Sequence, residues 1–245
     1  MNWYKKAETA VSVTSAEFGA MTWDEKVDLA RNRSISPLTQ RLFFTEQYGE
    51  RGGVLWSLAR NESIAPEIQR PFFTEPYEVG YAVLCNLAGN PSITLKTQRL
   101  FFTEKYGNKS QVLENLARNT SIHPEVQRLL ITEKYAGKRG VLQSLARNTS
   151  IHPEIQRLLF TEKYEEKDFA LWILARNEGI TPETQRLLIT EKYEDKDNAL
   201  WILARNEKFL RDFTPDELLQ IKKVARGNIK LHVLSKRLKQ IVGVP

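Results

Sequence analysis

The stretch RNTSIHPEIQRLLFTEKYEEKDFALWILA, residues 147–175, is one copy of a unit that recurs every 29 residues along the chain. Its first position is held in turn by Arg31, Arg60, Gly89, Arg118, Arg147, Arg176 and Arg205. Asparagine follows each of them, at Asn32, Asn61, Asn90, Asn119, Asn148, Asn177 and Asn206. A fixed period between about 20 and 50 residues is typical of stacked repeat arrays. The sequence therefore predicts an array of repeated units instead of one closed core.

Each unit predicts a pair of helices. In the quoted copy Pro153 and Glu154 open the first helix, because proline at the first helical position loses no hydrogen bond and an acidic residue suits the positive end of the dipole. Ile155, Leu158 and Leu159 then share one apolar face at a 3.6-residue period. The second helix, of the ALWILAR type, ends at Arg-Asn, where a cation and a left-handed asparagine cap suit a helix C-terminus. No strand period is visible, so we expect an all-α fold.

The period divides the chain into three predicted segments. Residues 1–21 are expected to form an N-terminal cap or arm, residues 22–207 the array, and residues 208–245 a basic C-terminal helical cap. Terminal units must be atypical because they close the array. In the second repeat, Pro71 and Pro76 are expected to kink or split the first helix.

Composition limits the classes of function. The net charge of +6 lies in residues 208–245, which hold nine basic and three acidic residues, so residues 1–207 balance to zero. The single cysteine, Cys85, excludes an intrachain disulfide and leaves too few thiolates for a Cys-rich metal site. Residues 1–20 have no signal-peptide core, and no apolar run approaches the ~18 residues of a membrane helix. We expect a cytoplasmic protein that does not enter a membrane.

The run LARNTSIHPEIQRLLFTEKY resembles the variant leucine-rich repeat and its HEAT-like relatives. In that family a helix ending in Ala-Arg-Asn is followed by a Pro-Glu that opens the next helix. The resemblance covers about residues 22–207, although the family's repeats are shorter than these. It implies a right-handed, curved α-solenoid and no particular chemistry, because such arrays serve many unrelated binding roles.

No enzyme signature is present, so we predict a non-enzymatic protein without a cofactor, a metal or an evident small-molecule substrate. The sequence has no glycine-rich phosphate loop, no H-E-x-x-H and no cysteine pair. His123 and His152 precede prolines in successive units and are interpreted as helix-start residues, not as ligands. Cys85 lacks an activating base, so its thiol would stay mostly protonated.

A Gln-Arg pair recurs in the first helix of every unit. On a helical wheel Arg157 lies opposite the apolar face, and stacked hairpins ~10 Å apart would align the arginines in a row. Such a row could follow a phosphate backbone, or each arginine could pair with a glutamate three positions earlier or in the adjacent unit. The candidate nucleic-acid-binding arginines are Arg41, Arg70, Arg99, Arg128, Arg157 and Arg186.

Two other surfaces are candidates. At two variable positions of the second helix the last two units carry Trp172–Ile173 and Trp201–Ile202, an apolar patch that either binds a protein or is covered by the C-terminal cap. The basic C-terminal region is either a solvated cap or a grip for nucleic acid or an acidic protein. Its candidate residues are Lys222, Lys223, Lys236, Arg237 and Lys239.

These observations support two main hypotheses. We prefer a scaffold that binds a protein partner through its extended solenoid surface and the Trp172/Trp201 patch. The alternative is a nucleic-acid-binding solenoid that uses the Gln-Arg pairs and the basic C-terminal helices. A third, a HEAT-like DNA glycosylase, would need an acidic catalytic residue in an aromatic-lined groove, and the sequence identifies none.

Overall fold

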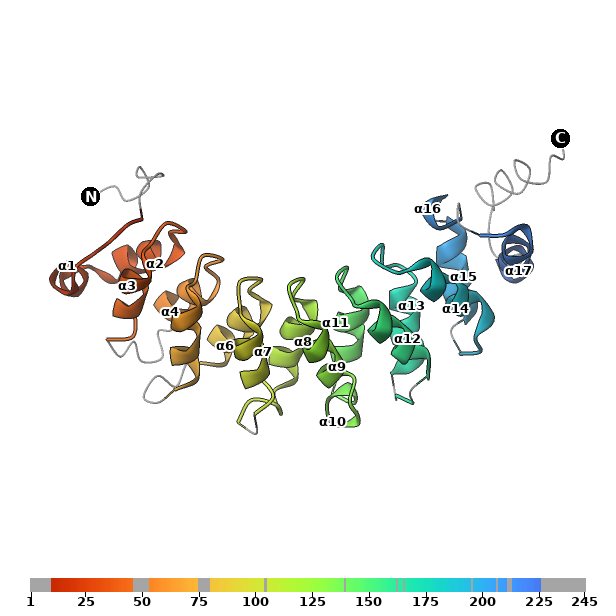
Figure 1. The fold of residues 1–245 in the computed structure, drawn as a ribbon, viewed down its shortest axis with the longest axis horizontal. Helices are drawn as coiled ribbons and strands as arrows, with labels where there is room; N and C mark the ends of the chain where they lie inside the picture. The colour runs from red at the N-terminus through yellow and green to blue at the C-terminus, as the bar shows by residue number, and fades with distance from the viewer. Residues whose placement is uncertain are drawn as a thin grey trace. The chain divides into compact units, whose positions relative to one another are not determined.

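The described part of the chain is α-helical, and its helices pack against neighbours in sequence order, as in an α-solenoid (Figure 1). In those residues the only pairing of extended backbone is an isolated bridge between Val11 and Ile35. The chain forms two compact units, residues 1–126 and 127–245, and each is described by itself. The computed structural model describes residues 10–45, 53–74, 80–103, 105–138, 140–161, 163–164, 166–194, 196–205, 207–210 and 213–225.

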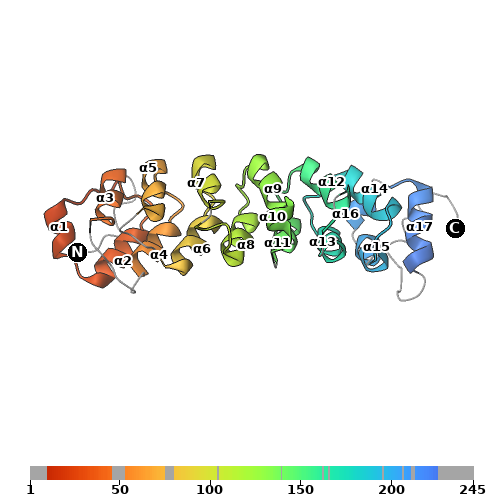
Figure 2. The same cartoon turned by 90° about the horizontal axis from the view of Figure 1, so that it is seen from below.

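The first unit alternates between two rows of helices. Helices α2, α4, α6 and α8 pack successively in one row, and α3, α5 and α7 lie in the other (Figure 2). Its elements are α1 (Ser15–Ala20), α2 (Trp23–Arg31), α3 (Pro37–Leu42), α4 (Gly53–Ala59), α5 (Pro66–Gln69), the 3₁₀ helix η2 (Arg70–Phe73), α6 (Tyr81–Gly89), α7 (Leu95–Leu100) and α8 (Ser110–Arg118). As expected, Pro71 coincides with a break, because α5 ends at Gln69 and η2 follows.

The second unit has the same alternation. Helices α11, α13 and α15 pack in succession, and α12 packs against α14. Its elements are α10 (Glu133–Ala136), α11 (Val141–Arg147), α12 (Pro153–Thr161), α13 (Lys167–Leu174), α14 (Pro182–Thr190), α15 (Lys196–Arg205), α16 (Glu207–Leu210) and α17 (Pro215–Ala225), while α9 (Pro124–Leu130) contains the boundary between the units.

The apolar stripes of both helices form the core. In α12, Ile155, Leu159 and Phe160 are buried, whereas Leu158 is half-buried at the edge of the stripe. In α11 one face is fully buried, at Val141, Leu142, Leu145 and Ala146. The helical period therefore identifies the residues on which the hairpins stack.

Residues before α2 cover the first hairpin. Phe18 of α1 is buried, and its ring packs edge-on against Phe43 with 5.0 Å between the ring centroids. Two capping boxes start α1 and α2, one of Thr14 with Glu17 and one of Thr22 with Glu25.

The asparagines that end the second helices do not adopt the expected left-handed conformation. At Asn90 the backbone is extended (φ −75°, ψ 122°), and this prediction was wrong. The reason is that the side chain bonds to the preceding repeat. Asn90 Nδ2 donates to the carbonyls of Ala59 (2.7 Å) and Asn61 (2.9 Å), and Oδ1 accepts from the Ser92 N–H. Equivalent bonds are made by Asn61, Asn119 and Asn177.

Candidate binding surfaces

The glutamines of the Gln-Arg pairs are structural. Gln98 Nε2 donates to the carbonyls of Ile93 (3.2 Å) and Ser121 (3.1 Å), and its Oε1 accepts from the His123 N–H at 2.9 Å. The side chain thus joins its own hairpin to the next. Sequence reasoning missed this role, although each glutamine borders the apolar stripe on a helical wheel. The buried members are Gln40, Gln69, Gln98, Gln127, Gln156 and Gln185.

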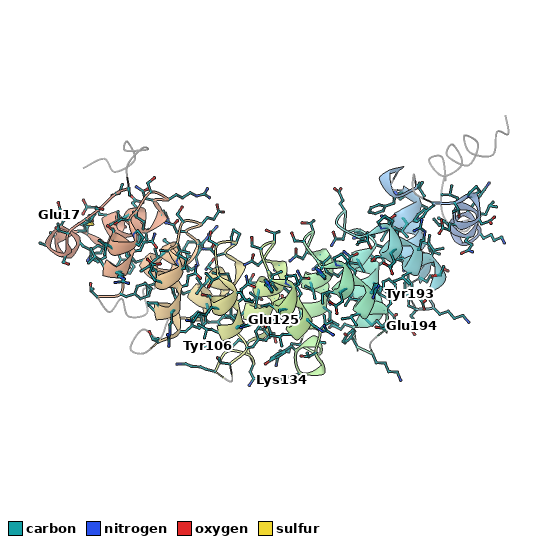
Figure 3. The ribbon with its side chains drawn as sticks, in the orientation of Figure 1. Glu17, Tyr106, Glu125, Lys134, Tyr193 and Glu194 are labelled. Atoms are coloured by element: carbon teal, nitrogen blue, oxygen red, sulfur yellow. The ribbon has the colours of Figure 1, made fainter. Side chains whose placement is uncertain are left out.

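The neighbouring arginines are exposed, as predicted, but most of them are paired. Arg99 binds Glu125 of the following hairpin through two hydrogen bonds, of 2.9 Å from Nε and 2.6 Å from Nη2. Glu125 is labelled in Figure 3. The hydrogen bond raises the pKa of Arg99 and lowers that of Glu125. The same kind of pair joins Arg128 to Glu154 (3.0 Å), Arg157 to Glu183 (3.4 Å) and Arg186 to Glu217 (3.1 Å).

The first two arginines of the series, unlike the other four, are not bound to a glutamate of the described residues. Arg41 and Arg70 are exposed and form no ion pair within the described residues. Lys96 stands 26 residues after Arg70, at the position where Glu125 follows Arg99. The arginines therefore do not form a continuous row available to phosphates.

The tryptophans lie on adjacent second helices, α13 and α15. Trp172 is half-buried and stacks on Phe169, with centroids 5.2 Å apart and the rings 18° from parallel. Phe169 is 41% exposed. Trp201 and Ile202 remain half-buried although α17 packs against α15. We call Phe169, Trp172, Trp201 and Ile202 the aromatic patch.

Ile173, also expected on this surface, lies in the core. Its side chain is 3% exposed, so it is not accessible to a partner. The reason is helical geometry, since Ile173 shares the inner face of α13 with Ala170 and Leu174, both fully buried.

Trp172 and Trp201, which occupy equivalent positions in α13 and α15, are each contacted by the arginine four residues later. The Arg176 guanidinium lies 3.9 Å from the centre of the Trp172 ring, and that of Arg205 lies 4.5 Å from Trp201. The sequence analysis treated these arginines only as helix-ending cations. The spacing of Trp and Arg by four residues was the signal that could have revealed the contact.

The remaining residues singled out in the sequence are the basic residues of the C-terminal region, two histidines and the cysteine. On α17, Lys222 is half-buried and Lys223 is exposed, whereas Lys236, Arg237 and Lys239 lie outside the described residues. The Nδ1 atoms of His123 and His152 accept from backbone N–H groups of the following first turn, at 3.2 and 3.4 Å. Burial raises the pKa of the half-buried Cys85 thiol.

No group of His, Cys, Asp and Glu side chains in the described residues could hold a metal ion, and none of the helices there has the length and apolarity to cross a membrane. The chain matches no protein-family model, no curated protein and no solved structure.

Proposed function

We propose that this chain is a right-handed α-solenoid of 29-residue helical hairpins that acts without catalysis as a cytoplasmic scaffold for a protein partner. The observation that carries the proposal is the aromatic patch on α13 and α15. The stacked Phe169–Trp172 pair on α13 and the half-buried Trp201 on the neighbouring α15 present rigid apolar area, which favours a protein interface.

The nucleic-acid alternative has less support. Four arginines of the first helices are bound to glutamates of the following hairpin, and a phosphate would have to displace those carboxylates. The charge of residues 1–207 also sums to zero.

The test is affinity purification of the tagged full chain from its native host, with and without nuclease. Trp172→Ala combined with Trp201→Ala is expected to lose a protein that the wild type retains after nuclease treatment. Trp56→Ala is the matched control, because Trp56 occupies the same position in α4 and also carries an arginine, Arg60, at 4.6 Å. Recovery of nucleic acid without protein, or equal recovery by both variants, would contradict the proposal.

A further inference from the structure

Three arginines of the second unit lie at the C-terminal ends of successive helices and form no ion pair with a described residue. Arg147, Arg176 and Arg205 follow or end α11, α13 and α15, which pack in that order. All three are exposed, and none forms an ion pair with a described residue. They contrast with the first-helix arginines of the same unit, each of which has a glutamate.

The same positions of the first unit do not form such a row. Arg31 and Arg118 each pair with a carboxylate on their own helix, at 3.8 and 3.5 Å, and Gly89 replaces the arginine of α6. Of the arginines at this position in the first unit, Arg60 forms no ion pair with a described residue. Adjacent unpaired guanidinium groups are therefore a property of the second unit.

Two of these guanidinium groups lie over tryptophan rings, Arg176 over Trp172 and Arg205 over Trp201. A guanidinium that lies on an aromatic face keeps its in-plane N–H donors directed away from the ring, where they can bind a carboxylate through two hydrogen bonds. Within the described residues no carboxylate forms an ion pair with these guanidinium groups. Of the acidic residues in this unit, Glu166 accepts from Gln143 Nε2 at 3.0 Å, and the exposed Glu178 forms no ion pair with a described residue.

The stacking also disfavours a nucleic acid at this surface. Single-stranded nucleic acids need open aromatic faces on which bases can stack. Phe169 precedes Trp172 by about one helical turn and Arg176 follows it by about one turn, so the indole is covered from both directions along the helix. At Trp172 the surface therefore offers guanidinium donors and a ring edge instead of an open stacking platform.

We propose that Arg147, Arg176 and Arg205 bind the carboxylates of an extended acidic segment of the protein partner, an inference that rests on the proposed function. Neighbouring helices lie ~10 Å apart. In a polyproline II segment every third residue falls on the same side, about 9 Å further along. The spacing therefore fits a segment with Glu or Asp at every third position, whose intervening apolar residues contact the aromatic patch.

The test measures fluorescence anisotropy of labelled peptides with the full chain. The probe is a peptide of about twelve residues that repeats Glu-Pro-Leu, long enough at ~3.1 Å per residue to span the three helices. The controls are a Gln-Pro-Leu peptide and an oligothymidylate of similar length. We expect the acidic peptide to bind at least about tenfold more tightly than either control, with an affinity that falls as salt rises.

Protein variants locate the contact. Arg147→Gln, Arg176→Gln and Arg205→Gln together are expected to abolish the preference for glutamate, with only a small fall in melting temperature, because these side chains are exposed and lose only the contacts of Arg176 and Arg205 with the tryptophan rings and a cation at each helix end. Arg128→Gln with Arg157→Gln, which alters paired arginines, should retain the preference. Equal binding of the Glu and Gln peptides, or tighter binding of the oligothymidylate, overturns the inference. If the arginine triple variant still captures the native partner while the tryptophan variant does not, the acidic chemistry is wrong and the protein-binding function stands.

Discussion

Gln156 and Gln185 occupy the same position in successive hairpins, but their hydrogen bonding differs. Gln156 Nε2 donates to the carbonyls of Ile151 (3.0 Å) and Gly179 (3.1 Å), and Oε1 accepts from the Thr181 N–H (3.0 Å). The buried Oε1 of Gln185 has no hydrogen-bond partner among the described residues. The difference coincides with the point where the sequence period breaks, because Pro215 comes four residues later than the pattern requires.

This contrast predicts unequal effects of the same substitution. Gln156→Leu should lower the free energy of unfolding by at least about 2 kcal/mol, because it leaves buried backbone groups without partners. Gln185→Leu should change it by less than about 1 kcal/mol, because an unsatisfied oxygen is removed. Urea unfolding followed by circular dichroism measures both. Equal losses would show that the bridge in the Gln156 hairpin contributes nothing specific.

At the scale of the element, two glycines differ in the space around them for a Cβ atom. Gly179 lies in the loop after α13, where an added Cβ would be 2.1 Å from the Thr149 carbonyl oxygen. Gly89 ends α6, and an added Cβ there would meet only the Asn115 Cβ, at 4.0 Å.

Alanine at these glycines should therefore have effects of opposite sign. Gly179→Ala should destabilise the protein by about 1–3 kcal/mol, because the loop backbone must shift. Gly89→Ala should stabilise it by about 0.5–1 kcal/mol, because alanine favours the helix. Thermal unfolding of the two variants beside the wild type checks the prediction. A stabilising Gly179→Ala would mean that the loop is not tightly packed against Thr149.

The sequence predicted the elements better than the contacts between them. Proline at the first helical position and the apolar period placed α12 and its buried face, and Pro71 placed a break. The extended Asn90 and the buried Gln98 were missed because both side chains form hydrogen bonds with backbone groups of a neighbouring hairpin. A helical wheel shows which residues face inward, but not that the carbonyls between stacked hairpins need donors.

The surfaces show the same limit. The exposure of Arg157 followed from the wheel, and its bond to Glu183 was one of two alternatives. The inward position of Ile173 was overlooked because it was considered beside Trp172 and not on its own face of α13. The absence of an ion pair at Arg176 within the described residues could not be predicted from the sequence, because that prediction needs the positions of the carboxylates around it.

At the scale of the whole molecule, acid acts on a chain that is already basic. With 36 Lys and Arg against 30 Asp and Glu, each protonated carboxylate adds to the net positive charge and to its self-repulsion. Among the described residues, three glutamate carboxyls have a pKa below the ordinary value of 4.5. Glu17 and Glu25 accept from the backbone and hydroxyl of Thr14 and Thr22, and Glu125 accepts from the Arg99 guanidinium.

These lowered pKa values determine the sign of the pH dependence. A carboxyl with a lower pKa in the folded state contributes stability above its unfolded pKa and loses it as the pH falls through the folded value. We therefore expect a melting temperature that is level near neutral pH and falls between about pH 5 and about pH 3. Thermal unfolding at a series of pH values measures the curve.

Replacing the three carboxyls tests whether they carry this dependence. Glu17→Gln, Glu25→Gln and Glu125→Gln together should lower the melting temperature at neutral pH and make its fall in acid shallower, so that the variant approaches the wild type at the lowest pH. Glu178→Gln, which changes an exposed carboxyl without an ion pair, should leave the shape unchanged. Parallel curves for the triple variant and the wild type would mean that acid acts through general charge repulsion and not through the helix caps and the Arg99–Glu125 pair. A convergent pair of curves would place the acid sensitivity of the fold at the starts of α1 and α2 and at the bond that joins α7 to the following hairpin.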